Sequence, residues 1–263
     1  MGDSKPPSAR ELATSERERA FARFNSVFEV HQAVLQIFET LSSMPNSMEA
    51  LKANIQLRKG MDPRVTQSQL NDYVQEMFTI VDNEKASGYA TVRSSTLISI
   101  CGAFEYLVKA TFVSHALEKP DEAASLLAKK KIRLLASDVL GAPPSEQWHV
   151  IADRLFEQLA DDERQMHKRV RVFLLEFTFL SDRADQTQRI EEAFEKIELE
   201  KFDEAFLIRN CLVHNGGRVS AALAHRPNWK LGELIHFESG SISPYVRPLR
   251  EIAGLMNILW LVI

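Results

Sequence analysis

The sequence is poor in the residues that interrupt helices. Only ten glycines and ten prolines occur in a chain of 263 residues. A β-sandwich or β-barrel needs turn residues at short and regular spacing along its whole length. Their scarcity argues against such folds and favours an all-α class. The chain is long enough for one large domain or two small ones, each with a buried core.

Cysteine is nearly absent as well. Cys101 and Cys211 are far apart, both lie in apolar helical contexts, and no Cys-x-x-Cys or Cys/His ligand spacing occurs. We expect two reduced, buried thiols, as in a reducing compartment. The sequence also lacks a Walker-type glycine loop, a dinucleotide fingerprint, His-Glu-x-x-His and Gly-x-Ser-x-Gly. We therefore expect no metal and no cofactor.

An excess of positive charge is missing too, because the formal net charge is −4. Proteins that bind nucleic acid by bulk electrostatics are usually strongly basic. Any RNA contact must therefore come from a local patch or from a partner subunit. The N-terminal residues lack the apolar core of a signal peptide, and no apolar run approaches the ~18 residues of a membrane span. We expect a cytoplasmic protein that makes no membrane contact.

Apolar residues recur at helical spacing along most of the chain. We expect a disordered tail over residues 1–13, an N-terminal helical extension over residues 14–85 and a helical domain over residues 86–263. Ser15, followed by two glutamates, is the expected start of the first long helix.

The last third of the chain changes its pattern twice. The stretch from Thr187 to His214 is expected to form one broken helix or two helices. After Pro227 a Ser–Gly turn between β-like runs predicts one short β-hairpin near residues 233–245. A final helix is expected from about Arg247.

Two polar features interrupt apolar segments. The most apolar long helix is expected between Ser87 and Leu117, and it carries Glu105. Because an ionised carboxylate buried alone is costly, Glu105 either reaches the surface or is directed at an active site. The second feature is a basic cluster that forms either a solvated face or a path for RNA: His167, Lys168, Arg169 and Arg171.

One segment, residues 207–219, combines groups that can do chemistry. Asn210 and His214 are four residues apart, so on a helix they project within about 40° of each other. Arg209 projects about 140° from His214, but its long side chain can fold round. A guanidinium, an amide and an imidazole therefore gather near one helix end, beside the glycine pair Gly216–Gly217.

These groups can cut RNA without a metal ion. An imidazole can take the proton of a 2′-hydroxyl or give one to the leaving oxygen. A guanidinium matches the oxygens of a phosphorane as negative charge develops, and Asn210 can hold the phosphate or orient His214. The alternative is structural, since an arginine and a histidine near a helix end can also bind its last carbonyls.

The string Arg-Asn-x-x-x-His-Asn-x-Gly resembles the signature of the HEPN superfamily. A long apolar helix with an internal polar residue precedes it at Ser95–Phe112, and a glycine-led segment, Gly232–Ile235, and a last helix follow. The resemblance covers about residues 87–263. The positions that carry it are Arg209, Asn210, His214, Asn215 and Gly217.

This resemblance implies a HEPN-like helical bundle, here with an N-terminal helical extension. It also implies a homodimer in which both Arg/His motifs face one cleft, and metal-independent RNA cleavage that leaves a cyclic phosphate end. Many members act in toxin–antitoxin, CRISPR-associated or phage-defence systems, which implies a toxin or anti-phage effector with an antitoxin or another defence-system protein as partner. Some members only bind nucleotides or proteins, so a non-catalytic module is the alternative.

Carried over by resemblance, each motif position has a role. Arg209 contacts the phosphate and the transition state, His214 is the acid, the base or a phosphate-orienting group, and Asn210 is a polar helper. Glu105 and Asn215 are supporting residues, and the transfer of Glu105 rests on its place in a helix.

Overall fold

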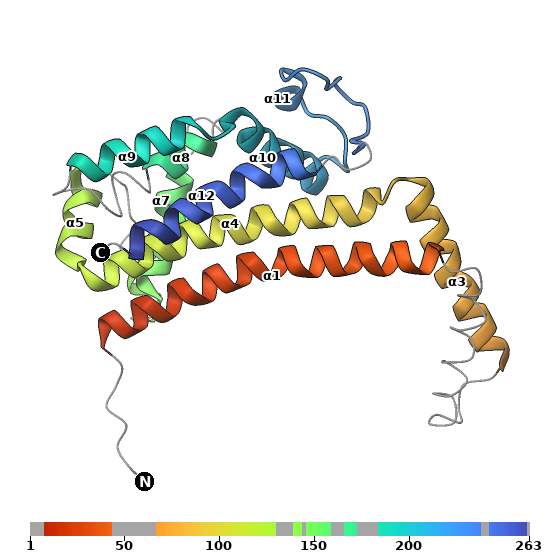
Figure 1. The fold of residues 1–263 in the computed structure, drawn as a ribbon. Coiled ribbons are helices and arrows are strands. Elements are labelled where there is room, and N and C mark those ends of the chain that lie inside the picture. Colours follow the sequence, from red (N-terminus) through yellow and green to blue (C-terminus); the bar gives the residue numbers. More distant parts are fainter. Residues whose placement is uncertain are drawn as a thin grey trace, which may run out of the picture. The chain divides into compact units, whose positions relative to one another are not determined.

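The computed structural model describes residues 8–43, 67–129, 139–143, 146–158, 166–172, 184–237 and 242–261. Within these ranges the protein is built from α-helices, with a single isolated β-bridge (Figure 1). The expected all-α class is therefore confirmed. The helices are α1 Ala9–Ser43, α3 Gln67–Ala86, α4 Ala90–Glu118, α5 Pro120–Lys129, α7 Gln147–Gln158, α8 Met166–Val172, α9 Ala184–Glu195, α10 Leu199–His214, α11 Ala221–Ala224 and α12 Ser243–Leu261.

The residues fall into two compact units by their packing. Unit 1 joins Met1–Val27, Leu97–Ile235 and Ile242–Ile263, and unit 2 joins Phe28–Thr96 and His236–Ser241. The boundaries lie inside α1 and α4, because each of these helices contributes residues to both units. The domain division expected at residue 86 follows a change in sequence pattern and stays a prediction.

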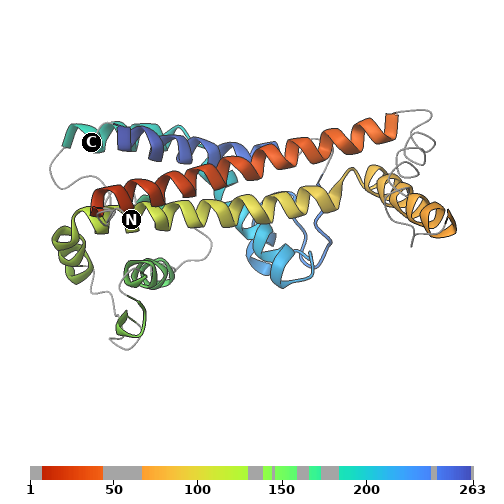
Figure 2. The same cartoon turned by 90° about the horizontal axis from the view of Figure 1, so that it is seen from below.

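The core of unit 1 forms around the second half of α4. This half lies alongside the first part of α1 (Figures 1 and 2), where the Ser114 hydroxyl donates to the Ala13 carbonyl at 2.7 Å. The Phe104 ring is fully buried and meets the ring of Phe24 on α1 at 6.1 Å and that of Phe202 on α10 at 5.3 Å, both edge to face. A helix that is apolar on most sides is either a core helix or a membrane span, and α4 has this composition.

The same composition makes α4 the one helix in the described ranges that is long and apolar enough to cross a membrane, whereas no such run was expected. Its apolar window is 67% buried inside the protein. Core helices pass this test of length and composition too, so it is weak evidence for a membrane span.

The first helix begins earlier than expected. The structure starts α1 at Ala9 instead of Ser15, so residues 9–13 belong to the helix, while residues 1–7 of the expected tail lie outside the described residues. The cause is a capping box: the Glu11 carboxylate accepts from the Ser8 backbone N–H at 2.7 Å, and the Glu11 N–H donates to the Ser8 hydroxyl at 3.3 Å. The bond from the Ser8 N–H, together with one from the Ser8 hydroxyl at 2.8 Å, also lowers the pKa of the Glu11 carboxyl.

The hairpin expected near residues 233–245 is wrong in its described part. Leu234 instead forms an antiparallel bridge with Arg218, and Ser243–Tyr245 belong to the first turn of α12. Pro244 explains the difference, because the first turn of a helix does not need the N–H that proline lacks. Residues 238–241, with the expected turn, lie outside the described residues.

The stretch from Thr187 to His214 resolves into two helices, α9 and α10. They are separated at Lys196–Glu198, where the backbone makes tight turns. The expectation of a break within this stretch is confirmed. In unit 1, α10 packs against α8, α11 and α12, so it is surrounded on several sides.

Candidate functional site

The candidate residues lie on α10, whose end is closed by backbone groups. The N–H groups of Asn215 and Gly217 both donate to the Cys211 carbonyl at 3.0 Å. Gly216 and Gly217 have φ angles of 58° and 75°, the left-handed region that glycine enters at low cost. The end of α10 is therefore capped without a side chain of the motif.

The chain after α10 is fastened to the strand-like segment at Gly232–Ile235. The Val219 N–H donates to the Glu233 carbonyl at 2.9 Å, and the Ile235 N–H donates to the Gly217 carbonyl at 2.8 Å. The Cys211 thiol lies 3.3 Å from the Ser220 hydroxyl, which caps α11. These bonds fix the position of the backbone that follows the motif, from Gly217 to Ser220.

Arg209 is held by two neighbours. Its Nη1 donates to Oδ1 of Asn210 at 2.9 Å, and its Nη2 lies 3.4 Å from Oε2 of Glu105 on α4. The side chains of Arg209 and Glu105 are 25% and 21% exposed. Glu105 is thus neither buried alone nor simply solvated: it faces the guanidinium.

The Nε–H of Arg209 is buried and finds no acceptor within the described part of the chain. A buried donor without an acceptor costs about 1–3 kcal/mol, so such groups are rare and call for an explanation. Two donors of the guanidinium are used by Asn210 and Glu105, out of the five that an arginine carries. Of the three that remain, the Nε–H is buried, so an anion from solvent would meet the guanidinium through the part of the side chain that is exposed.

His214 and Asn215 lie apart from this cluster. Both are exposed, and neither side chain makes a hydrogen bond or ion pair within the ranges that the structure describes. His214 projects about 140° from Arg209 around the axis of α10. The structure therefore gathers Glu105, Arg209 and Asn210, and it does not join His214 to them within one chain.

Both cysteines are free and buried, as expected. Cys101 lies one helical turn before Glu105 on α4. Burial raises the pKa of the Cys101 thiol far above its usual range; the charge of Glu105 raises it further and that of Arg209 opposes this. Burial thus disfavours the thiolate form of Cys101, and no part of its side chain is exposed to a substrate.

A buried carboxylate on α10 was not anticipated. Asp203 is 2% exposed, and it accepts from the backbone N–H of His167 at 2.9 Å and pairs with Nδ1 of the same histidine at 2.7 Å. Arg226 lies 3.7 Å from the same carboxylate. Arg171, also from the basic cluster, pairs with Glu191 at 2.7 Å. These contacts fasten α8 to α9 and α10, which favours a packing role for His167 and Arg171 over an RNA path.

Glu204, the next residue along α10, is a second unanticipated buried carboxylate. It accepts from the Trp229 indole N–H at 2.5 Å and from the Tyr245 hydroxyl at 3.3 Å, and it pairs with Lys201 at 2.7 Å. Burial raises the pKa of Tyr245, and the charge of Glu204 adds to this effect. Sequence spacing could not reveal either carboxylate's role, because most of their partners lie on other elements.

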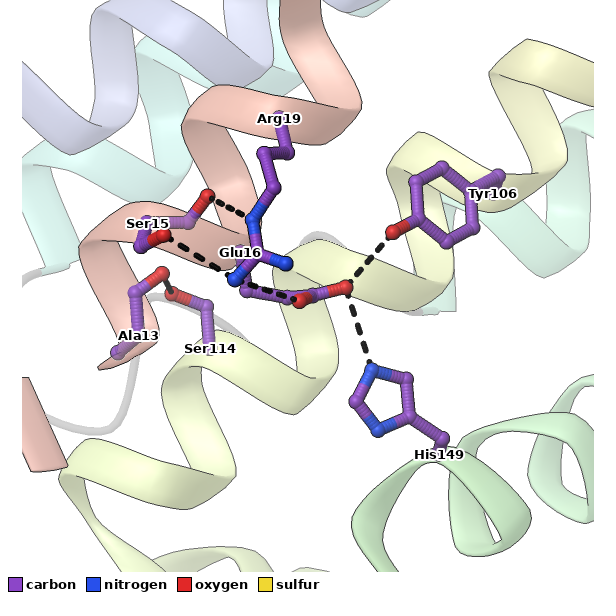
Figure 3. A network of polar contacts seen from close by, with 7 residues as sticks. All are labelled: Ala13, Ser15, Glu16, Arg19, Tyr106, Ser114 and His149. Atoms are coloured by element: carbon purple, nitrogen blue, oxygen red, sulfur yellow. Dashed lines mark hydrogen bonds and ion pairs between the residues drawn. The ribbon is translucent and has the colours of Figure 1, made fainter. Parts of the chain in front are cut away.

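A third polar network joins α1, α4 and α7 (Figure 3). The Glu16 carboxylate accepts from the Tyr106 hydroxyl at 2.8 Å, lies 3.2 Å from Nε2 of His149, and pairs with Arg19 at 3.7 Å. Burial raises the pKa of Glu16, but the hydrogen bonds from Tyr106 and His149 and the nearby positive charges outweigh it, so the net pKa is lowered. The network braces three helices of unit 1.

No family model, curated protein or solved structure matches this chain. Within the described residues, no three His, Cys, Asp or Glu side chains gather in a way that could hold a metal ion. The motif and its surroundings therefore carry the functional argument.

Proposed function

We propose that the protein is a metal-independent endoribonuclease whose site contains Arg209, Asn210 and His214, supported by Glu105 and Asn215. The observation that carries the proposal is the environment of Arg209. Its guanidinium is oriented by Asn210 and Glu105, and its buried Nε–H has no acceptor in the described part of the chain. An arginine held in place with donors to spare suits an anionic ligand such as a phosphodiester.

The structure of the helix end weakens the capping alternative. The backbone of Asn215 and Gly217 closes α10, and the hydrogen bonds of Arg209 go to side chains. His214 remains exposed, without a hydrogen bond in the described ranges. Neither side chain is thus used on the last carbonyls of the helix, which leaves both for another role.

The proposed reaction is a transesterification. The 2′-oxygen attacks the adjacent phosphorus, the bond from phosphorus to the 5′-oxygen breaks, and a cyclic phosphate and a 5′-hydroxyl result. The 2′-hydroxyl loses its proton and the departing oxygen gains one, and His214 serves in one of these transfers. Arg209 stabilises the charge on the phosphorane. Because Oδ1 of Asn210 accepts from Arg209, its amide N–H groups remain to hold the phosphate.

A homodimer is part of the proposal. Arg209 and His214 project about 140° apart on α10, so in the proposed dimer His214 of one copy would act beside Arg209 of the other. Large apolar side chains stand exposed near the helix end, as at an interface: Val213 is 46%, Leu231 68% and Leu234 49% exposed. By resemblance, the setting is a cytoplasmic toxin or anti-phage effector with an antitoxin or another defence-system protein as partner.

The test uses the purified protein and a labelled RNA pool, with products analysed for cyclic phosphate ends. His214→Ala and Arg209→Ala should each slow cleavage by about a hundredfold or more. His225→Ala, which changes an exposed histidine of the same unit, should leave the rate unchanged. EDTA should have no effect. Full cleavage by the His214→Ala variant would contradict the proposal.

A non-catalytic module that binds a nucleotide or a protein is the second candidate. The contact between Arg209 and Glu105 favours it, because the carboxylate offsets the positive charge of the guanidinium. In that case the motif is structural, and the combined Arg209→Ala and His214→Ala variant should lose about 1–2 kcal/mol of stability. An unchanged unfolding temperature together with lost cleavage would exclude this candidate.

A further inference from the structure

Unit 2 exposes large apolar side chains on two helices. On α1, Val30 is 62% and Ile37 is 56% exposed; on α3, Tyr73 is 57% and Ile80 is 50% exposed. Each pair is separated by seven residues, so its members project within about 20° of each other, two turns apart. Single exposed apolar residues are ordinary, but a repeat at helical spacing forms a stripe that can receive another helix.

The stripe on α3 is not the face that packs into unit 2. Val74 and Val81, the residues that follow Tyr73 and Ile80, are buried at 0% and 5% exposure. They supply the inward face of the helix, and the stripe lies about 100° away from them. Packing within this unit is also secured elsewhere, where His31 on α1 meets the Thr96 hydroxyl at 2.5 Å. The exposed side chains of Tyr73 and Ile80 are therefore not needed for packing within unit 2.

The surroundings of these stripes are acidic. Along α3 four carboxylates oppose one basic residue, Lys85. Glu29 immediately precedes Val30, and Asp72 immediately precedes Tyr73, so each stripe begins beside an exposed carboxylate. None of the following exposed acids forms an ion pair with another described residue: Glu29, Asp72, Glu76 and Asp82.

This combination selects the kind of partner. A second copy of the same face would bring like charges together, which disfavours self-association through it. A helix with apolar residues at matching spacing and lysine or arginine beside them would cover the apolar side chains and neutralise the acids. We propose that the outer stripes of α1 and α3 in unit 2 are each a docking surface for a cationic amphipathic helix of a partner protein.

The proposal does not depend on RNA cleavage, and its test uses binding alone. The probe is a synthetic helical peptide of about five turns, with leucine at positions i, i+3, i+4 and i+7 and lysine elsewhere. One control peptide has glutamate in place of lysine, and another has the lysine sequence scrambled. The full-length protein should bind the helical lysine peptide at least about tenfold more tightly than either control, and salt should weaken the binding.

Two double variants locate the surface. Tyr73→Asp with Ile80→Asp, and Val30→Asp with Ile37→Asp, should each lower the number of lysine peptides bound, and the two changes combined should weaken binding by about tenfold or more. Leu12→Asp with Leu140→Asp is the matched control, because it changes two exposed apolar residues elsewhere, and it should bind like the parent. Circular dichroism checks that each variant is folded.

Loss of binding in either double variant, with the control unaffected, supports the proposal. Equal binding of the glutamate or scrambled peptide would overturn it, as would unchanged binding in both double variants. A dimer in sedimentation that the same variants dissociate would also overturn it, because the stripes would then join two copies of this chain.

Discussion

Nη2 of Arg209 lies 3.4 Å from Oε2 of Glu105, so the guanidinium of the candidate site is paired with a carboxylate from another helix. The pair can act in two ways on a bound phosphodiester. It orients the arginine, which favours the reaction, and it places a negative charge near the phosphate, which weakens binding. The two effects can be separated by kinetics.

Glu105→Gln removes the charge and keeps a hydrogen-bond acceptor for Arg209. It should lower the KM for RNA by about three- to tenfold, because a like charge near a surface anion costs on the order of 1 kcal/mol. Glu105→Ala removes the support altogether and should lower kcat by about tenfold or more. Steady-state rates across RNA concentrations give both parameters. Parent values of KM and kcat in both variants would exclude a positioning role for Glu105.

Phe104→Ala should lower the free energy of unfolding by about 3–5 kcal/mol, the usual effect of emptying a buried aromatic site. The ring is fully buried and meets aromatic rings from α1 and α10. Denaturant unfolding followed by circular dichroism measures the loss. Tyr73→Ala is the control, because that side chain is 57% exposed, and its effect should stay within about 0.5 kcal/mol. Similar losses in both variants would show that the core is not centred on Phe104.

Gly217→Ala should destabilise the protein by about 1–2 kcal/mol. The residue has a φ of 75° and closes the end of α10, and a side chain strains this left-handed conformation. Gly254→Ala is the matched substitution inside α12, where an added Cβ meets nothing within 4 Å. It should instead stabilise the protein, by about 0.4–1 kcal/mol. The unfolding temperatures of the two variants should therefore shift in opposite directions. A shift in the same direction would contradict the left-handed conformation at Gly217.

The Glu16 network in Figure 3 should make stability depend on pH. The pKa of the Glu16 carboxyl is lowered in the folded protein from its ordinary value of 4.5. The ionised carboxylate therefore stabilises the folded state above pH 4.5. That contribution is lost as the pH falls below 4.5 and through the lowered pKa of the folded state. The wild type should thus be more stable than Glu16→Gln near neutral pH, and the difference should shrink in acid.

Unfolding curves of the two proteins at several pH values measure this difference. Glu18→Gln, at an exposed position on the same helix, should show no such convergence with the wild type. If the difference in the free energy of unfolding between the wild type and Glu16→Gln stays constant across the acid range, the network stabilises the fold by packing and not by the charge of Glu16.

The helical class and most helices could be predicted because apolar spacing is a local signal. The end of α10 was equally readable, since two glycines follow the last apolar positions. The start of α1 was missed although its capping box, Ser8 with Glu11, is also a local signal. A second helix-start pattern at Ser15 led to a predicted start that is six residues too late. Local signals therefore fail mainly where two of them compete.

The polar contacts of the site show where sequence reasoning stops. Glu105 was predicted to reach either the surface or an active site, and its contact with Arg209 joins residues that are 104 positions apart. The partners of Asp203 and Glu204 were not predicted, because nothing in the spacing of His167 or Trp229 connects them to α10. Such pairs depend on how helices cross, which the sequence pattern does not encode residue by residue.

Three charged side chains of α10 are engaged on different neighbours: Asp203 with α8, Glu204 with the segment before α12, and Arg209 with α4. Sliding the helix by one turn, about 5.4 Å, would separate all three pairs at once. It would leave Asp203 buried without His167, and Glu204 with only Lys201 of its own helix. The register of α10 is therefore locked. Any adjustment of the motif to a ligand must come from side-chain rotation or from the chain beyond Gly217, because α10 itself does not shift along its axis.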